Sequence, residues 1–247
     1  AAGQIQHDFK GTLGFSWPRR ADQFANNYGQ PDYDPLFPFG HGLTYSDNGN
    51  LATLSEDPGL DPNAARSNTW FDRGVATTGL TLRLIDGNGV PMDIIHPQAR
   101  TGDGALSMVA INTDVQEGAR EFTWSGNAAM ELHANAPVDL VRETNGDVFV
   151  VATVRVDALP DDGKVSLVAT CGKDCRAELP LGDTLAALPR GEWTRLGIQL
   201  RCLRVAGADT GQLESPFSLH AGTGMRIALA QVSAGTEFDH RLDCPLQ

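Results

Sequence analysis

The chain has 247 residues, of which 41% are hydrophobic, and a formal net charge of −12 at pH 7. This length supports one large β domain or two smaller units. An acidic surface repels polyphosphate, and no apolar run approaches the roughly 20 residues that cross a bilayer. Composition therefore argues against nucleic-acid and membrane partners.

Two motifs stand near the start of the chain, GFSWP at residues 14–18 and FPFGHGLTY at residues 37–45. With the residues between them, they resemble the end of the second domain of family 3 glycoside hydrolases, although His41 stands where that family more often has Tyr or Phe. The remainder is similar to the extra carboxy-terminal sandwich of some bacterial exo-β-glucanases of this family. The resemblance predicts a boundary between residues 1–48, the tail of an α/β domain, and residues 49–247, an accessory β-sandwich.

The resemblance also implies what this chain lacks. Family 3 enzymes retain configuration with an Asp nucleophile and a Glu acid/base, which must lie about 5 to 5.5 Å apart. Neither residue has a matching position here, so no catalytic residue is assigned. We expect the chain to be inert alone and to belong with upstream catalytic domains that hydrolyse β-glucans without a cofactor. An exposed apolar patch on residues 1–45, and hence self-association, follows from the same reasoning.

Residues 46–73 are rich in Asp, Asn, Gly and Pro and predict a linker with an irregular lead-in. From residue 79 onward, apolar residues alternate with the period of two that is typical of strands. Without amphipathic helices between them, these segments predict a mostly β protein, an antiparallel sandwich or jelly roll. Helical turns are expected at 184–188 and 208–213. The expected strands are 80–84 and 90–95, which form a hairpin, then 121–125, 130–134, 147–156, 164–171, 193–202 and 225–232.

The four cysteines predict disulfides. Cys171 and Cys175 flank a short turn that can bring their Cα atoms within bonding range, which leaves Cys202 to pair with Cys244. This is one of three pairings. A zinc site is the alternative, but the spacing is not that of paired zinc knuckles. Disulfides predict a periplasmic or secreted protein.

Trp193 is the candidate for carbohydrate binding. Strand parity places Thr194, Leu196 and Ile198 on one face, so Trp193 shares the other face with Arg195 and Gln199. An indole ring can pack on a pyranose while polar neighbours bind its hydroxyls. The alternative is that Trp193 packs at the sandwich edge or against a catalytic domain.

The remaining candidates have simpler interpretations. Trp124 shares parity with Phe122 and is expected in the core, whereas Trp70 and Phe71 lie in the lead-in, where an interdomain contact or a ligand contact would fit equally. Asp86, Asn88 and Asp93 could supply oxygens to a structural calcium ion, but Asp-Gly-Asn-Gly is first a turn sequence. The sequence thus predicts an accessory region that orients catalytic domains, or alternatively a module that binds β-glucan.

Overall fold

The computed structural model describes residues 7–20, 23, 25–47, 54, 68–113, 117–242 and 244. The chain divides into two compact units, residues 1–66 and residues 67–247. The boundary expected between residues 48 and 49 falls where the chain is not described, so it stays a prediction. No helix within the described residues is long and apolar enough to span a membrane.

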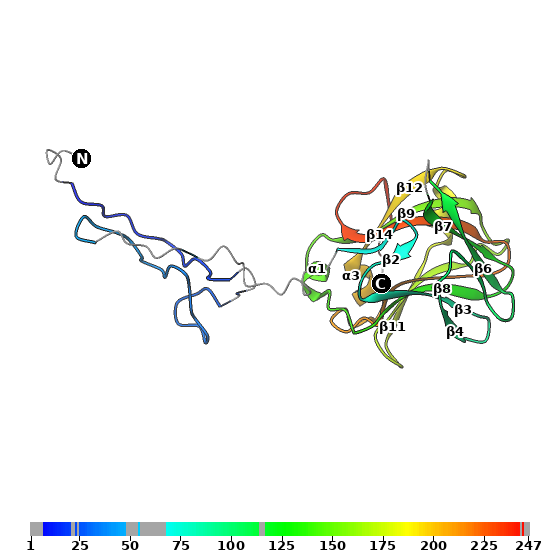
Figure 1. Ribbon diagram of the computed structural model, residues 1–247, viewed down its shortest axis with the longest axis horizontal. Coiled ribbons are helices and arrows are strands. Elements are labelled where there is room, and N and C mark those ends of the chain that lie inside the picture. The colour runs from blue at the N-terminus through cyan, green and yellow to red at the C-terminus, as the bar shows by residue number, and fades with distance from the viewer. Residues whose placement is uncertain are drawn as a thin grey trace. The chain divides into compact units, whose positions relative to one another are not determined.

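In the described part of the second unit, two sheets stack face to face (Figure 1). Neighbouring strands run antiparallel except β12 and β15, which are parallel. The larger sheet has the order β15 (His240–Leu242), β12 (Trp193–Gln199), β9 (Phe149–Ala158), β14 (Arg226–Gly235), β7 (Glu117–Trp124), β6 (Leu106–Asn112) and β5 (Gln98–Arg100), with β1 (Thr69–Asp72) beside β14 and β2 (Val75–Ala76) beside β1. The smaller sheet has the order β11 (Arg176–Pro180), β10 (Val165–Thr170), β13 (Ser215–Ala221), β8 (Ala128–Ala134), β3 (Leu80–Ile85) and β4 (Pro91–Asp93). The predicted antiparallel sandwich, including the hairpin of β3 and β4, is confirmed.

The core lies between the two sheets and follows from the alternation of the strands. In β9, Val150, Ala152, Val154 and Val156 all face the core. Each fully buried Val contributes about 1.5 to 3 kcal/mol, so the alternation along this strand stabilises the packing of the larger sheet on the core. Trp124 is also in the core, as expected, and its Nε1 donates a hydrogen bond of 2.9 Å to the Ala128 carbonyl.

Three short helices, α1 (Val141–Asn145), α2 (Gly182–Ala187) and α3 (Leu200–Val205), complete the described part of the sandwich. The turn expected at 184–188 corresponds to α2, but two other expectations were wrong. The strand expected to reach residue 202 ends at residue 199, and the helix expected at 208–213 lies instead at α3. The reason is burial: Leu200 and Leu203, three residues apart, both enter the core, a spacing that suits a helix.

The lead-in also differs from the sequence expectation. Trp70 and Phe71 are 4% and 0% exposed, and they belong to β1 within the irregular stretch that was expected up to residue 73. The interdomain and ligand interpretations of these two residues were therefore wrong. A strand of four residues is too short to display a clear period, and its pairing with β14 decides its conformation.

The two predicted disulfides are confirmed. Cys171 bonds to Cys175 across the turn between β10 and β11, and Cys202 of α3 bonds to Cys244. Because all four cysteines are in disulfides, the zinc interpretation was wrong. The second bridge closes the longer loop, with a sequence separation of 42, and so constrains the unfolded chain more strongly.

In the first unit, two arms of chain pair through backbone hydrogen bonds. The Trp17 amide donates to the Phe37 carbonyl, and the Leu13 amide donates to the His41 carbonyl, both at 2.8 Å. Close to this pairing, a Cβ on Gly42 would lie 2.5 Å from the Gly11 carbonyl oxygen, so glycine permits the close approach. The two motifs noted in the sequence therefore lie against each other.

Candidate functional site

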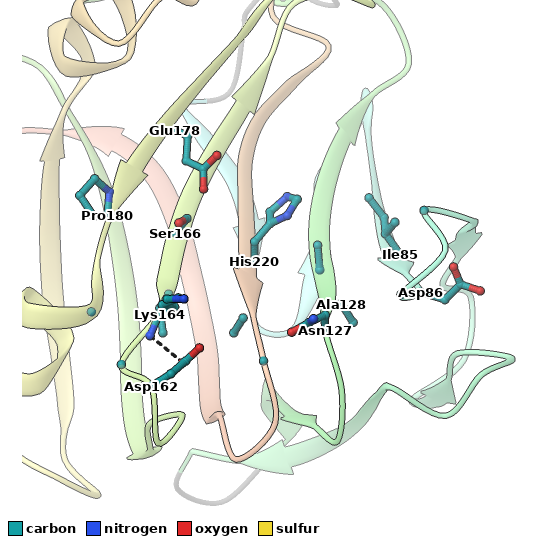
Figure 2. Close-up of a pocket in the computed structure, with 18 of the residues that line it drawn as sticks. Ile85, Asp86, Asn127, Ala128, Asp162, Lys164, Ser166, Glu178, Pro180 and His220 are labelled. Carbon is teal, nitrogen blue, oxygen red and sulfur yellow. Dashed lines mark hydrogen bonds between the residues drawn. The ribbon is translucent and has the colours of Figure 1, made fainter.

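A groove with a volume of about 700 Å³ lies on the outer face of the smaller sheet (Figure 2). Its size falls within the range of small-molecule sites. The strands supply its floor, and its rim comes from turns around Asp86, Asn127 and Asp162 and from the start of α2. None of the described residues that line it is Phe, Tyr or Trp.

One cross-strand row forms the floor of this groove. In this row, His220 of β13 stands directly between Ser166 of β10 and Ala129 of β8. Because both neighbours are small, the imidazole is the largest side chain at the centre of the floor. Figure 2 shows His220 and Glu178 projecting from the strands on either side of the one that carries Ser166. The complete row reads Pro180, Ser166, His220, Ala129, Ile85 and Pro91.

The electrostatics of the floor keep His220 neutral. Burial lowers the pKa of its imidazole below the usual value, and the Arg176 guanidinium lowers this pKa further, whereas the Glu178 carboxylate opposes both effects. Arg176 Nη2 lies 2.8 Å from Glu178 Oε2, which weakens the pull of Glu178 on the imidazole. A neutral imidazole offers one donor and one acceptor to a ligand.

The rim turn between β3 and β4 is held in place from the opposite sheet. Asp103, in the turn between β5 and β6, accepts hydrogen bonds from the Ala105 amide, the Thr101 hydroxyl and the Gly87 amide. These bonds favour the ionised carboxylate and so lower the pKa of Asp103; the Ala105 amide has the largest effect and the Gly87 amide the smallest of the three. The carboxylate therefore ties the rim at Gly87 to the larger sheet and fixes one wall of the groove.

The predicted candidate Trp193 lies on the other side of the sandwich, at the start of β12 on the outer face of the larger sheet. It is half-buried, and the Arg155 guanidinium stands 5.4 Å from the centre of its ring. Arg155 in turn contacts Glu121 and Asp157 at 3.0 and 2.9 Å. The indole therefore meets a cation on its own sheet.

Arg195 and Gln199 share that face with Trp193, as parity predicted, but both have protein partners. Arg195 binds Asp239 through its guanidinium at 3.0 Å and through its backbone amide at 2.9 Å. Gln199 donates to Asp147 at 3.3 Å. The predicted carbohydrate-binding set is thus brought to one face, where its polar groups contact neighbours of the same chain.

The residues considered for calcium serve other purposes. Asp86 Oδ1 accepts hydrogen bonds from the amides of Asn88 and Val90, which stabilises the hairpin turn. Asp93 pairs with Arg83. Within the described part of the chain, no three His, Cys, Asp or Glu side chains gather as they would around a metal ion.

The first unit carries a separate, apolar hollow of about 500 Å³. Phe9, Trp17 and Leu43 line it and are 64%, 46% and 47% exposed. Phe37 supports Trp17 edge-on at 5.8 Å, and His41 packs against Phe37 at 4.9 Å. Large aromatic side chains held in this arrangement leave a substantial apolar surface open.

A family model described as galactose-binding domain-like matches residues 81–234, most of the sandwich. The chain belongs to this Exop_C family. A search of curated protein sequences returns no match. This membership confirms the fold class, and together with two solved structures it confirms the sequence-based recognition.

Two solved structures extend the Exop_C assignment. The exo-1,3/1,4-β-glucanase ExoP from a Pseudoalteromonas species matches 98% of this chain at 28% identity, with a TM-score of 0.61, although this chain spans only 29% of that one. The isolated extra carboxy-terminal domain of the same enzyme matches 73% of this chain and 100% of its own length at 21% identity, with a TM-score of 0.59. The match to the whole enzyme therefore reaches beyond its extra domain, as the opening motifs predicted.

Sequence reasoning missed the groove. Strand β13, which carries His220, was not predicted, because its Pro216 interrupts the apolar alternation. Strand β11, which carries Glu178, was not predicted either. The available signal was the run of small residues, Gly163, Ser166, Ala129 and Gly222, that converge here, but only strand pairing brings them together.

Proposed function

We propose that this chain is the non-catalytic accessory region of a family 3 exo-1,3/1,4-β-glucanase, where it packs on the catalytic domains and stabilises their relative orientation. The observation that carries the proposal is the apolar hollow of the first unit. Its walls are aromatic and hydrogen-bonded into a defined shape, yet Phe9 is 64% exposed. Such a surface is expected to be covered by another part of an enzyme.

The similarity to ExoP supports the same conclusion, because it covers nearly all of this chain and only 29% of the enzyme. A partner that covers the hollow would then come from the catalytic region that the matched enzyme also contains. The two disulfides support a further proposal, that the protein works in the periplasm or outside the cell, since such bonds persist in oxidising compartments.

The hollow makes a direct test accessible. In sedimentation velocity, the chain should associate as its concentration rises, because burying the hollow against a second copy removes apolar surface from water. The double variant Phe9→Ser with Leu43→Ser should abolish this association. Tyr28→Ser is the matched control, since Tyr28 is 82% exposed but does not line the hollow.

Two outcomes would contradict the proposal. A wild-type chain that stays monomeric at high concentration would remove the argument from the hollow. Hydrolysis of an aryl β-glucoside by the purified chain, above a blank, would show that the region is catalytic. We expect neither result.

The alternative function is a module that anchors an enzyme to β-glucan through Trp193, Arg195 and Gln199. Its supporting observation is that the three side chains do share one face of β12. The Arg155 cation over the indole and the Asp239 partner of Arg195 favour the accessory role instead. Titration of laminarin into wild type and Trp193→Ala separates the two, because the alternative requires heat or a fluorescence change that the variant loses.

A further inference from the structure

The groove on the smaller sheet contains polar side chains without partners. Within the described residues, the side chains of Ser166, Asn127, Lys164 and His220 make no hydrogen bond. Asn127 and Lys164 stand at the rim, and the other two lie on the floor (Figure 2). Asn127 and Lys164 are exposed and Ser166 and His220 are half-buried, so water reaches all four. Because no protein group among the described residues occupies these side chains, they are available to hydrogen-bond a ligand that enters the groove.

The charges of the lining restrict that ligand. Four carboxylates, those of Asp86, Asp162, Asp183 and Glu178, line the groove against the single ammonium of Lys164. An acidic ligand would be repelled, which excludes uronate polymers. With no Phe, Tyr or Trp among the described lining residues, a flat apolar ligand would find no large apolar ring to stack on.

We propose that this groove is a binding site for a neutral saccharide, whose hydroxyls exchange hydrogen bonds with His220, Ser166 and Asn127 and donate to Glu178. The inference does not depend on the accessory role proposed above, and it differs from the alternative module in using the opposite sheet. A chain that packs on catalytic domains through its first unit can also bind a saccharide in this groove.

The chemistry of these groups fits sugar hydroxyls. Each hydroxyl donates one hydrogen bond and accepts others, so the neutral imidazole of His220 can accept from one hydroxyl and donate to its neighbour. The Glu178 carboxylate accepts from hydroxyls, and charge-assisted bonds of this kind are the stronger ones. The Asn127 amide supplies both a donor and an acceptor at the rim. Small residues beside His220 leave room for a ring that lies flat on the floor.

The test is calorimetric titration of the full chain with three neutral probes, laminaritriose, cellotriose and lactose. At least one should bind saturably. His220→Ala should weaken that binding at least tenfold, because it removes the central donor and acceptor. Ser166→Leu should abolish binding by filling the floor while leaving the unfolding temperature nearly unchanged, since residue 166 faces outward.

His133→Ala is the matched control. His133 also stands on the outer face of the smaller sheet, on β8, but it does not line the groove. This variant should bind as wild type does. An oligomer of alginate, which carries carboxylates, should bind more weakly than the neutral probes.

Three results would overturn the proposal. The first is that none of the three neutral probes binds saturably. The second is that His133→Ala weakens binding as much as His220→Ala does. The third is that Trp193→Ala abolishes binding while His220→Ala retains it, which would place the saccharide on the larger sheet and support the alternative module instead.

Discussion

The polar side chains around Trp193 on the larger sheet and those on the floor of the groove on the smaller sheet differ in whether they have protein partners. On the larger sheet, Arg155 contacts two carboxylates and an indole, and Arg195 is bound to Asp239. On the smaller sheet, the side chains of His220 and Ser166 lie in a groove without hydrogen-bond partners among the described residues. Alternation along a strand therefore predicts which side chains face outward. Whether those side chains are available to a ligand depends on the protein groups that they already contact.

The covering of the larger sheet depends on the chain that follows β14. Phe238 packs on Phe149 with ring centres 4.5 Å apart, and it lies directly over Gly197 of β12. Strand β15 then pairs with β12, and Cys244 is bonded to Cys202. The smaller sheet has no corresponding cover over the groove in the part of the chain described here.

The largest effect is expected from removing the bridge that holds this covering segment. The double variant Cys202→Ala with Cys244→Ala should lower the free energy of unfolding by about 4 kcal/mol, because the unfolded chain regains the entropy of the long loop. Urea denaturation measures this loss. Replacing Cys171 and Cys175 instead should cost about 2 kcal/mol, since their loop is short; equal losses would contradict the loop-length argument.

Breaking the network on the larger sheet should have the next largest effect. Arg155→Leu leaves Glu121 and Asp157, which are 23% and 12% exposed, without their shared cation. We expect a loss of about 3 kcal/mol in unfolding free energy. Arg195→Leu is the control: Arg195 and Asp239 are each almost half exposed, so water screens the pair and its loss should cost much less. Equal losses would mean that Glu121 and Asp157 do not depend on Arg155 for their stability.

A smaller effect tests the aromatic cover. Gly197→Ala would place a Cβ 2.6 Å from the Phe238 ring, so the ring must move away, at a cost of about 2 kcal/mol. Gly235→Ala is the matched change on β14, where the new Cβ would meet Val151 at an ordinary 3.7 Å. Thermal unfolding should separate the two variants. Similar melting temperatures would mean that Phe238 does not pack tightly on β12.

The smallest effect concerns the groove and depends on pH. The pKa of His220 is lowered in the folded state, so the unfolded state takes up a proton first as pH falls below about 6.5. The stability that neutral His220 confers is therefore complete above that pH and is lost as pH falls toward the folded-state pKa. His220→Gln should match wild type at pH 8 and lose less stability by pH 5, as urea midpoints would report. An unchanged pH slope would contradict the burial of the imidazole.

The sequence by itself determined the fold class, the main strands, both disulfides and the family. These features rest on local or short-range signals: the period of two in β9, the short Cys171 to Cys175 spacing, and two adjacent aromatic motifs. It also placed Trp193, Arg195 and Gln199 on one face, because alternation along a single strand requires no knowledge of other strands.

Only the tertiary structure decided what those faces contact. Arg155 meets Trp193 because β9 pairs with β12, and His220 meets Ser166 and Ala129 because β13 pairs with β10 and β8. The helix at residues 200–205 likewise depends on the core that receives Leu200 and Leu203. Strand order and register are set by packing between residues far apart in the chain, and a single sequence does not reveal which distant strands will be neighbours.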